Sequence, residues 1–304
     1  MENQSTVSYF LLLEFSKNRH LQILHFFLFF ALYLATITAN LLIISAVALD
    51  NQLHTPMHLF LMNLAVEDLG IVSVIIPKSM INSLMDTRHI SYLGCVAQVL
   101  IFSSFEASDL FLLTVMAYDR YVAICYPLHY ELIVNWKACT KIVVLVWVTS
   151  LLYGMLHTIG TFYLPFCSNV VNQFFCEIPH LLKLSCFGFN LVEVGFLVAS
   201  ITAGFGCFIF IIFSYTMIFK AVLRIPSVKG RQKTFSTCLP HLIVFSMFLI
   251  TVCLAYLRSP SDTPSYLDLA LTALYSLLPP LFNPIIYSIR NKNIKSVLSK
   301  LWRL

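Results

Sequence analysis

The chain has 304 residues, of which 59% are hydrophobic and only 11% are charged. This balance excludes an ordinary soluble protein, because too few polar side chains remain to cover the surface of one or two globular domains. The net charge of +5 does not indicate a nucleic-acid partner, since the lysines and arginines gather in short segments between long apolar runs, where they act as topology signals.

Seven apolar runs are long enough to cross a bilayer as helices, which takes roughly 20 residues. They cover residues 22–49, 57–79, 93–122, 138–164, 191–219, 234–257 and 266–289. The first run is too long for the core of a cleavable signal peptide, and barrel strands would alternate in polarity. The sequence therefore predicts an all-α membrane protein with one domain, a seven-transmembrane helix bundle over 22–289 between an N-terminal segment, 1–21, and a tail, 290–304.

The basic residues predict the orientation, because cytoplasmic loops carry an excess of lysine and arginine. Thirteen lie on the side of the C-terminus: Arg120, Lys137, Lys141, Lys220, Arg224, Lys229, Arg231, Lys233, Arg290, Lys292, Lys295, Lys300 and Arg303. Six lie on the other side: Lys17, Arg19, Lys78, Arg88, Lys183 and Arg258. We expect a multi-pass plasma-membrane protein with its N-terminus outside the cell and its C-terminus in the cytoplasm.

Two further features agree with this orientation. Asn3 begins an acceptor sequence for glycosylation, which is used only on the lumenal side. Four cysteines fall on the expected outer side, where disulfides persist: Cys95, Cys167, Cys176 and Cys186. They allow three pairings, and their positions do not choose among these. We expect the others to be free thiols: Cys125, Cys139, Cys207, Cys238 and Cys253.

Apolar residues recur at helical spacing after the last span, at Ile294, Val297, Leu298 and Leu301, with lysines among them. This pattern predicts a short amphipathic C-terminal helix on the inner membrane surface. A frayed tail is the alternative.

Asp68 lies in the middle of the second span, and Glu106 and Asp109 lie in the third. A carboxyl group is costly in lipid, so each should face the bundle interior and have a partner, a bound cation or a proton. Asp68 and Asp109 are therefore a candidate sodium site or proton switch. The alternative is that they are protonated or water-bound groups that only hold helices together.

An acid and a base are adjacent at the inner end of the third span, in the run from Met116 to Cys125. The Asp119 carboxylate can hold the Arg120 guanidinium until a competing partner takes it, which makes the pair a plausible switch. A surface salt bridge of little energy is the alternative.

The last span contains Pro279, Pro280 and Pro284. Each proline removes a backbone donor and bends the helix. We expect Asn283 to satisfy carbonyl groups freed in this way while reaching a neighbour such as Asp68. A simple kink would explain the prolines but not Asn283 and Tyr287 beside them.

Together these segments resemble the olfactory receptor family of rhodopsin-like G protein-coupled receptors, from about Leu49 to Asn291. Five motifs carry the resemblance, in the order and spacing of the family: Pro56 to Leu61, Met116 to Cys125 with Pro127 to Tyr130, Ser214-Tyr215, Lys233 to Cys238, and Pro279 to Asn291. The resemblance implies a receptor for small volatile odorants that activates a stimulatory heterotrimeric G protein and raises cyclic AMP. We expect no enzyme activity, no nucleic-acid partner and no cofactor apart from the candidate sodium ion, with membrane lipid as the surroundings.

The resemblance also implies roles for particular residues. The disulfides would be Cys95–Cys176 and Cys167–Cys186. Coupling to the G protein would involve Asp119, Arg120, Tyr121, Tyr215, Asn283, Pro284 and Tyr287. The ligand would bind among Phe102, Ser103, Glu106, Ala199, Ala203, Val252, Tyr256 and Ser276.

Glu106 is the unusual member of this expected pocket. It follows Cys95 by eleven residues, which places it roughly 16 Å into the membrane by helical rise. An ionised Glu106 would favour an amine, whereas a protonated one would donate a hydrogen bond to a carbonyl or alcohol. A third reading is that Glu106 joins Asp68 and Asp109 in an internal ion network without touching the ligand.

The chain departs from the family pattern at four places. Ala39 precedes Asn40 where glycine is usual, and Asp109 replaces a usual glutamate, which shortens the reach to an ion held with Asp68. Leu249 and Ile250 stand where a Tyr-Gly pair is common, and Pro240 replaces a usual serine.

Two other classes of protein are weighed against a receptor. A secondary transporter could use the buried carboxyl groups as an ion relay, but paired internal repeats with matching broken helices are not seen. A membrane enzyme is disfavoured by the lack of a His-Glu-x-x-His or Gly-x-Ser-x-Gly motif. His54 and His58 have the spacing of metal ligands, but we expect them to lie at a loop and a helix start instead.

Overall fold

The computed structural model describes residues 7–186, 191–256 and 266–290, and seven helices in these ranges are long and apolar enough to cross a membrane. They are α1 (Arg19–Leu49), α2 (Pro56–Met85), α3 (Tyr92–Cys125), α5 (Trp136–Phe162), α7 (Leu191–Leu223), α8 (Val228–Tyr256) and α9 (Tyr266–Arg290). The predicted seven-helix bundle is therefore confirmed. Asn3 and the expected amphipathic helix around residues 294–301 lie outside the described residues.

Most helices extend beyond the apolar runs that predict them. Helix α2 continues past Pro77 and ends only at Asp86, whose left-handed backbone (φ 52°) terminates it. Asn18, Ser91 and Asn135 cap the starts of α1, α3 and α5 by accepting a hydrogen bond from a backbone N–H of the first turn. The helices are longer than the apolar runs because their backbone hydrogen bonds continue into polar residues beyond the hydrocarbon layer.

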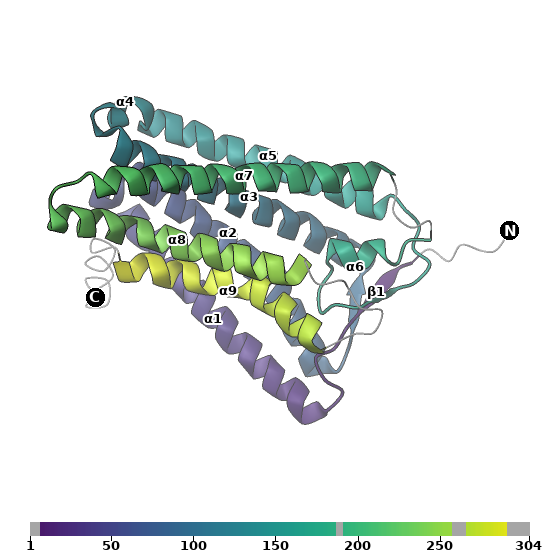
Figure 1. Cartoon of the computed structure of the whole chain (residues 1–304). Helices are drawn as coiled ribbons and strands as arrows, with labels where there is room; N and C mark the ends of the chain where they lie inside the picture. The colour runs from purple at the N-terminus through teal and green to yellow at the C-terminus, as the bar shows by residue number, and fades with distance from the viewer. Residues whose placement is uncertain (1–6, 187–190, 257–265, 291–304) are drawn as a thin grey trace.

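A small sheet lies at one end of the bundle, on the right in Figure 1. Strand β1 (Tyr9–Leu12) pairs antiparallel with β2 (His89–Ser91) and parallel with β3 (Val170–Val171), in the order β2-β1-β3. The short helix α6 (Ile178–Leu182) is at the same end. We call this the disulfide end, since both disulfides described below are there. The sheet was not predicted from the sequence.

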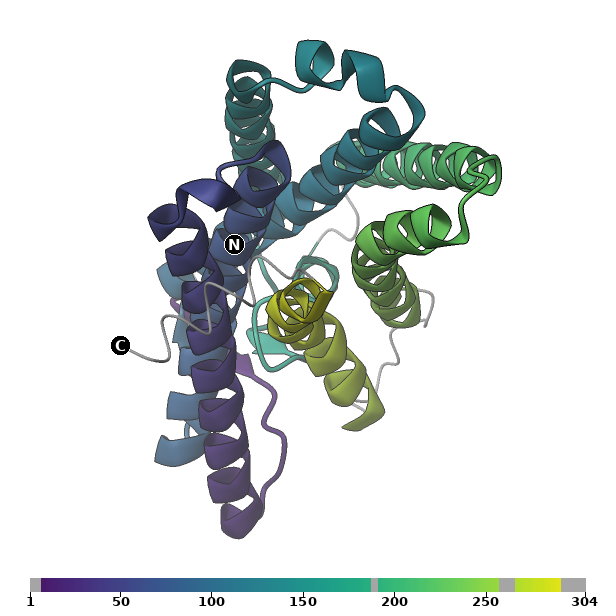
Figure 2. The same ribbon diagram turned by 90° about the vertical axis from the view of Figure 1, so that its left-hand side faces the viewer.

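The opposite end carries the connections between α1 and α2 and between α3 and α5, and we call it the Arg120 end. These connections contain the 3-10 turns η1 (Asn51–Leu53) and η2 (Pro127–His129) and the one-turn helix α4 (Tyr130–Ile133), visible at the left of Figure 1. Seen from this end in Figure 2, α8 lies between α7 and α9.

Helix α3 is the central element, in contact with α2, α5, α7 and α8. Its approach to α5 depends on Gly154, where a Cβ atom would lie 2.0 Å from the Ser104 hydroxyl and 2.8 Å from the Leu100 carbonyl oxygen. Small residues allow this close packing between membrane helices. The apolar core runs along α3, from Phe10 and Val171 of the sheet to Leu113 and Val143 toward the Arg120 end.

Candidate functional site

A lid covers the disulfide end, formed by residues 166–186. The disulfide Cys95–Cys176 joins it to α3, and Cys167–Cys186 closes it on itself, so the structure contains both pairs that the resemblance implies. Gln98 of α3 accepts a hydrogen bond from the Cys176 backbone N–H at 2.8 Å. Strand β1 packs its buried Phe10 against this region. The lid is thus held by covalent bonds, by α3 and by the N-terminal strand.

Two side-chain hydrogen bonds fasten the lid to α9. Gln173 donates to the Thr272 hydroxyl at 2.7 Å, and the Tyr275 hydroxyl donates to Glu177. Burial raises the pKa of Glu177 to about 7, although the hydrogen bond from Tyr275 opposes this shift. His180 lies 3.8 Å from the other Glu177 oxygen, and burial lowers the pKa of this histidine. Glu177 therefore has polar partners on two sides.

Below the lid is a cavity of about 430 Å³ between α3, α5, α7 and α8. Five of the expected ligand-binding residues line it: Phe102, Ser103, Glu106, Ala199 and Ala203. The sequence analysis did not single out Tyr153, His157, Ser200, Glu177 and Phe248, which also line it. The volume and largely apolar wall suit a small organic molecule.

The other three expected pocket residues are not among the described residues that line the cavity. Ser276 is not among the described residues that line the cavity; it is buried, and its hydroxyl donates to the Thr272 carbonyl one turn earlier in α9. The role of Ser276 in ligand binding therefore stays a prediction. The side chains of Val252 and Tyr256 lie outside the described part of the structure.

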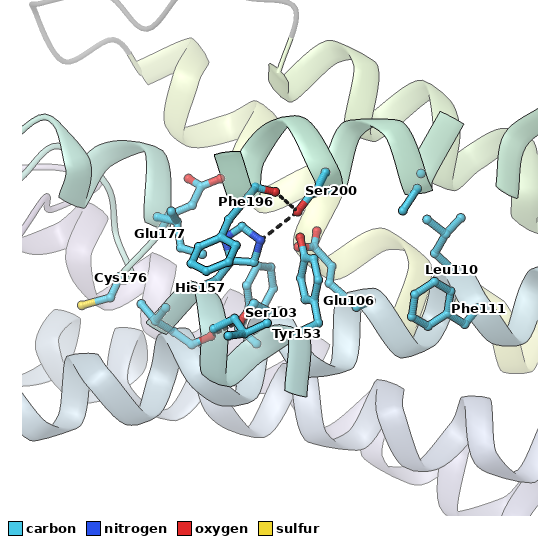
Figure 3. A pocket seen from close by; sticks show the side chains of 18 of the residues that line it. Ser103, Glu106, Leu110, Phe111, Tyr153, His157, Cys176, Glu177, Phe196 and Ser200 are labelled. Carbon is cyan, nitrogen blue, oxygen red and sulfur yellow. Dashed lines mark hydrogen bonds between the residues drawn. The ribbon is translucent and has the colours of Figure 1, made fainter. Parts of the chain in front are cut away.

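A polar pair joins α5 to α7 in the cavity wall. His157 Nε2 lies 2.8 Å from the Ser200 hydroxyl, which itself donates to the Phe196 carbonyl at 2.7 Å, as Figure 3 shows. Because that hydroxyl has one hydrogen, His157 Nε2 must be the donor of the first bond. A histidine deep in a span is a signal that sequence reasoning could have used. Ser200 gives no comparable signal, since serine is common in membrane helices.

Glu106 is the exception among the polar groups of the cavity. Its carboxyl group lines the cavity, and no described residue donates a hydrogen bond to it or forms an ion pair with it. Ser103, one turn away, uses its hydroxyl on the Val99 carbonyl at 2.6 Å. Among the described lining residues there is no lysine or arginine. In Figure 3, Glu106 and Glu177 lie apart, with His157 between them in the view.

The buried carboxyl groups of α2 and α3 form a second polar region. Asn283 donates to both oxygens of Asp68, at 3.1 and 3.2 Å. Glu67, which the sequence analysis overlooked, is fully buried and accepts a hydrogen bond from Ser108 of α3. In the described part of the chain, one oxygen each of Glu67, Asp109 and Asn283 has no partner. No described group of three or more His, Cys, Asp or Glu has the arrangement of a metal site.

The carbonyl group freed by Pro284 is that of Pro280, four residues earlier in α9. The side-chain amide of Asn40 in α1 donates a hydrogen bond to this carbonyl oxygen at 3.0 Å. Asn283 instead faces Asp68, so our expectation that Asn283 serves the freed carbonyl is wrong, while its reach to Asp68 is as expected. The reason is that α1 packs against α9, which brings Asn40 within reach of that carbonyl oxygen.

At the Arg120 end, Arg120 is held by its neighbour Asp119. Nη2 and Nε lie 2.6 and 3.0 Å from Asp119 Oδ2, and Tyr130 of α4 donates to Oδ1 at 2.7 Å. Asp119 is buried, so this is not a solvated surface pair. Burial and the neighbouring Asp119 both raise the pKa of Tyr130, which keeps its hydroxyl a donor. Tyr121 points elsewhere, toward Tyr126 at 3.4 Å.

A second contact at this end joins α8 to α3. His241, next to Pro240, lies 2.9 Å through Nε2 from the Leu113 carbonyl, so Nε2 donates. Its Nδ1 is 2.6 Å from the Tyr215 hydroxyl of α7. Tyr287 of α9 is buried, and its hydroxyl has no partner among the described residues. Three helices are therefore joined through one buried histidine.

The arrangement of these helices is that of squid rhodopsin. The chain superposes on squid rhodopsin with a TM-score of 0.76, over 94% of this chain and 86% of that one, at 16% identity. This likeness shows the fold.

The family is shown by sequence. The family model described as olfactory receptor matches residues 29–303. The chain is 49% identical to olfactory receptor 14C36 of Homo sapiens, over 100% of this chain and 97% of that protein. It is 43% identical to olfactory receptor 1D2 of Gorilla gorilla gorilla, over 98% and 96% of the two chains. The chain therefore belongs to the olfactory receptor family. It is a multi-pass plasma-membrane protein of a family of signalling receptors rather than enzymes.

Proposed function

We propose that this receptor binds a small volatile odorant in the cavity below the lid and activates a stimulatory G protein that raises cyclic AMP. The observation that carries the proposal is the continuity of α3, which lines the cavity at Phe102 and Glu106 and carries Arg120 at its other end. A change of packing at the cavity can reach the Asp119–Arg120 pair through this one helix.

Activation would require two contacts to break at the Arg120 end. Arg120 must leave Asp119, and α8 must leave α3 by giving up the hydrogen bond from His241 to the Leu113 carbonyl. Phe248 of α8 lines the cavity two turns from His241, so a ligand touching Phe248 acts on the same helix. The outward swing of α8 would open a cleft for the G protein, bounded by Tyr215 and Tyr287. The basic residues between 220 and 233 would flank this cleft.

The orientation belongs to the same proposal. The excess of lysine and arginine at the Arg120 end supports a cytoplasmic location of that end, and the disulfides support an extracellular location of the other. A gel shift on treatment with a glycosidase, lost in Asn3→Gln, tests it. A wild-type protein with no glycan at Asn3 despite reaching the cell surface would contradict this assignment of Asn3.

A sodium ion bound among the buried acids of α2 and α3 is part of the same proposal. The unpartnered oxygens of Asp109 and Asn283, together with Asp68, are the hard oxygen ligands that such an ion takes. A sodium-dependent rise of the melting temperature, lost in Asp68→Asn, is the expected result. An equal rise in wild type and variant would contradict the site.

The deciding experiment is a cyclic AMP screen of cells expressing this chain against a chemically diverse odorant panel. Arg120→Ala, at matched surface expression, should abolish the response to every active compound. Full ligand-dependent cyclic AMP production by this variant would overturn the role of Arg120. A chain that reaches the surface and answers no compound would count against the function itself.

A further inference from the structure

The cavity contains one carboxyl group, that of Glu106, that has no hydrogen-bond or ion-pair partner among the described residues. Glu106 and Glu177 both line it, but only Glu177 is engaged, by the Tyr275 hydroxyl and by His180. No described residue donates to the carboxyl group of Glu106. The two acids therefore have different roles. Glu177 helps to hold the lid on α9, and the carboxyl group of Glu106 is available to a ligand in the cavity.

The neighbours of Glu106 do not compensate for its charge. The polar hydrogens of Ser103 and Ser200 are used on backbone carbonyls, and His157 Nε2 is used on Ser200. No described lining residue is a lysine or arginine. An ionised carboxyl group in such surroundings is costly unless a cation or several donors approach it.

We propose that the ligands of this cavity are small primary or secondary amines, bound as ammonium ions with Glu106 as the counter-ion. An ammonium group supplies both a positive charge and hydrogen-bond donors, which is what this carboxylate lacks. The hydrocarbon part of the ligand lies against Phe102, Phe111 and Phe248. This inference rests on the proposed function, because it names the ligand class of the same cavity.

Glu177 strengthens the preference without binding the ligand directly. It lines the same cavity and adds negative potential, so it favours a cation over a neutral ligand. Its charge is only partial near neutral pH, since burial raises its pKa to about 7. Removing its charge should therefore matter less than removing that of Glu106.

The test compares three matched series on the full-length receptor: primary n-alkylamines, the corresponding alcohols and the corresponding aldehydes. Binding is measured as the ligand-induced rise in melting temperature of purified receptor, which needs no G protein, and activation is measured as cyclic AMP in cells. We expect the amines to bind and activate, and the alcohols and aldehydes of equal length to be at least roughly tenfold weaker.

Three variants test which carboxyl group binds the ammonium ion. Glu106→Gln, which keeps the shape, should weaken amine binding roughly tenfold or more. Glu106→Asp should retain the preference for amines over alcohols, and Glu177→Gln should weaken amine binding no more than about threefold. The comparison of amines with alcohols on wild type needs no variant, so misfolding of one variant leaves the test intact.

Two outcomes separate this inference from the proposed function. If alcohols or aldehydes bind as well as amines, or if Glu106→Gln leaves the amine affinity unchanged, the ligand class is wrong while a cyclic AMP response to other odorants preserves the receptor function. If amines raise the melting temperature through Glu106 but no cyclic AMP appears, the ligand class stands and the proposed coupling fails.

Discussion

Asn283 of α9 donates its side-chain amide to both carboxylate oxygens of Asp68 in α2, although 215 residues separate them in sequence. This pair joins two helices that pack together in the interior of the bundle. It also places the bend of α9 next to the buried acids of α2 and α3. The contact between these two helices is therefore a polar one.

The first prediction concerns this pair. Asn283→Ala leaves the buried Asp68 carboxyl group without its donor, which should lower the free energy of unfolding by about 1–3 kcal/mol. A double-mutant cycle with Asp68→Asn measures the coupling, expected near 1 kcal/mol. Strictly additive effects on the melting temperature would show that the two side chains do not stabilise each other.

The second prediction concerns the hold on Arg120. Tyr130→Phe removes the hydrogen bond to Asp119 Oδ1, so Asp119 is less firmly placed and Arg120 is released more often. Ligand-independent cyclic AMP should rise about fivefold, the equivalent of about 1 kcal/mol. Tyr126→Phe is the matched control, because the Tyr126 side chain contacts Tyr121, through its hydroxyl and its ring, and does not touch Asp119 in the described structure. Equal basal signalling in both variants would refute the role of Tyr130.

The third prediction concerns the packing of α3 against α5. Gly154→Ala places a Cβ atom 2.0 Å from the Ser104 hydroxyl and 2.8 Å from the backbone oxygen of Leu100, which cannot move alone. We expect a loss of about 1–3 kcal/mol and a lower melting temperature. Gly206→Ala is the control, since nothing lies within 4 Å of its added Cβ atom. That substitution should be neutral or stabilising, because alanine favours a helix. Tolerance of both changes would mean that α3 and α5 are further apart.

The fourth prediction concerns pH. The folded protein binds the proton of Glu177 more tightly than the unfolded chain, because its pKa is about 7 against an ordinary value of 4.5. The stability from this proton is complete below about pH 4.5 and is lost as the pH rises through about 7. The melting temperature of the wild type should therefore fall relative to that of Glu177→Gln between about pH 5 and about pH 8.

His180 must be removed from that comparison, because burial lowers its pKa and its contribution has the opposite slope at acid pH. Both proteins are therefore compared with His180→Asn added. If the melting temperatures of the two proteins change with pH in parallel across this range, Glu177 is not a buried acid.

Much of this receptor is determined by its sequence alone. Seven runs of about 20 apolar residues predict seven spans, because a helix satisfies its own backbone hydrogen bonds and must match the bilayer in length. The five motifs, among them the one around Asp119 and Arg120, together indicate the family, since each is a short run of sequence and needs no fold to be recognised. The position of Glu106 inside a span likewise follows from counting along one helix.

Only the tertiary structure decided which residues of different helices meet. The donor to the Pro280 carbonyl is Asn40 of α1 rather than Asn283, and the cavity wall is joined by His157 and Ser200 of α5 and α7. Such contacts depend on the rotation and tilt of each helix, which are set by packing against its neighbours. The strand β1 is decided in the same way: its partners β2 and β3 are distant in sequence, and an isolated strand of four residues has no stability of its own.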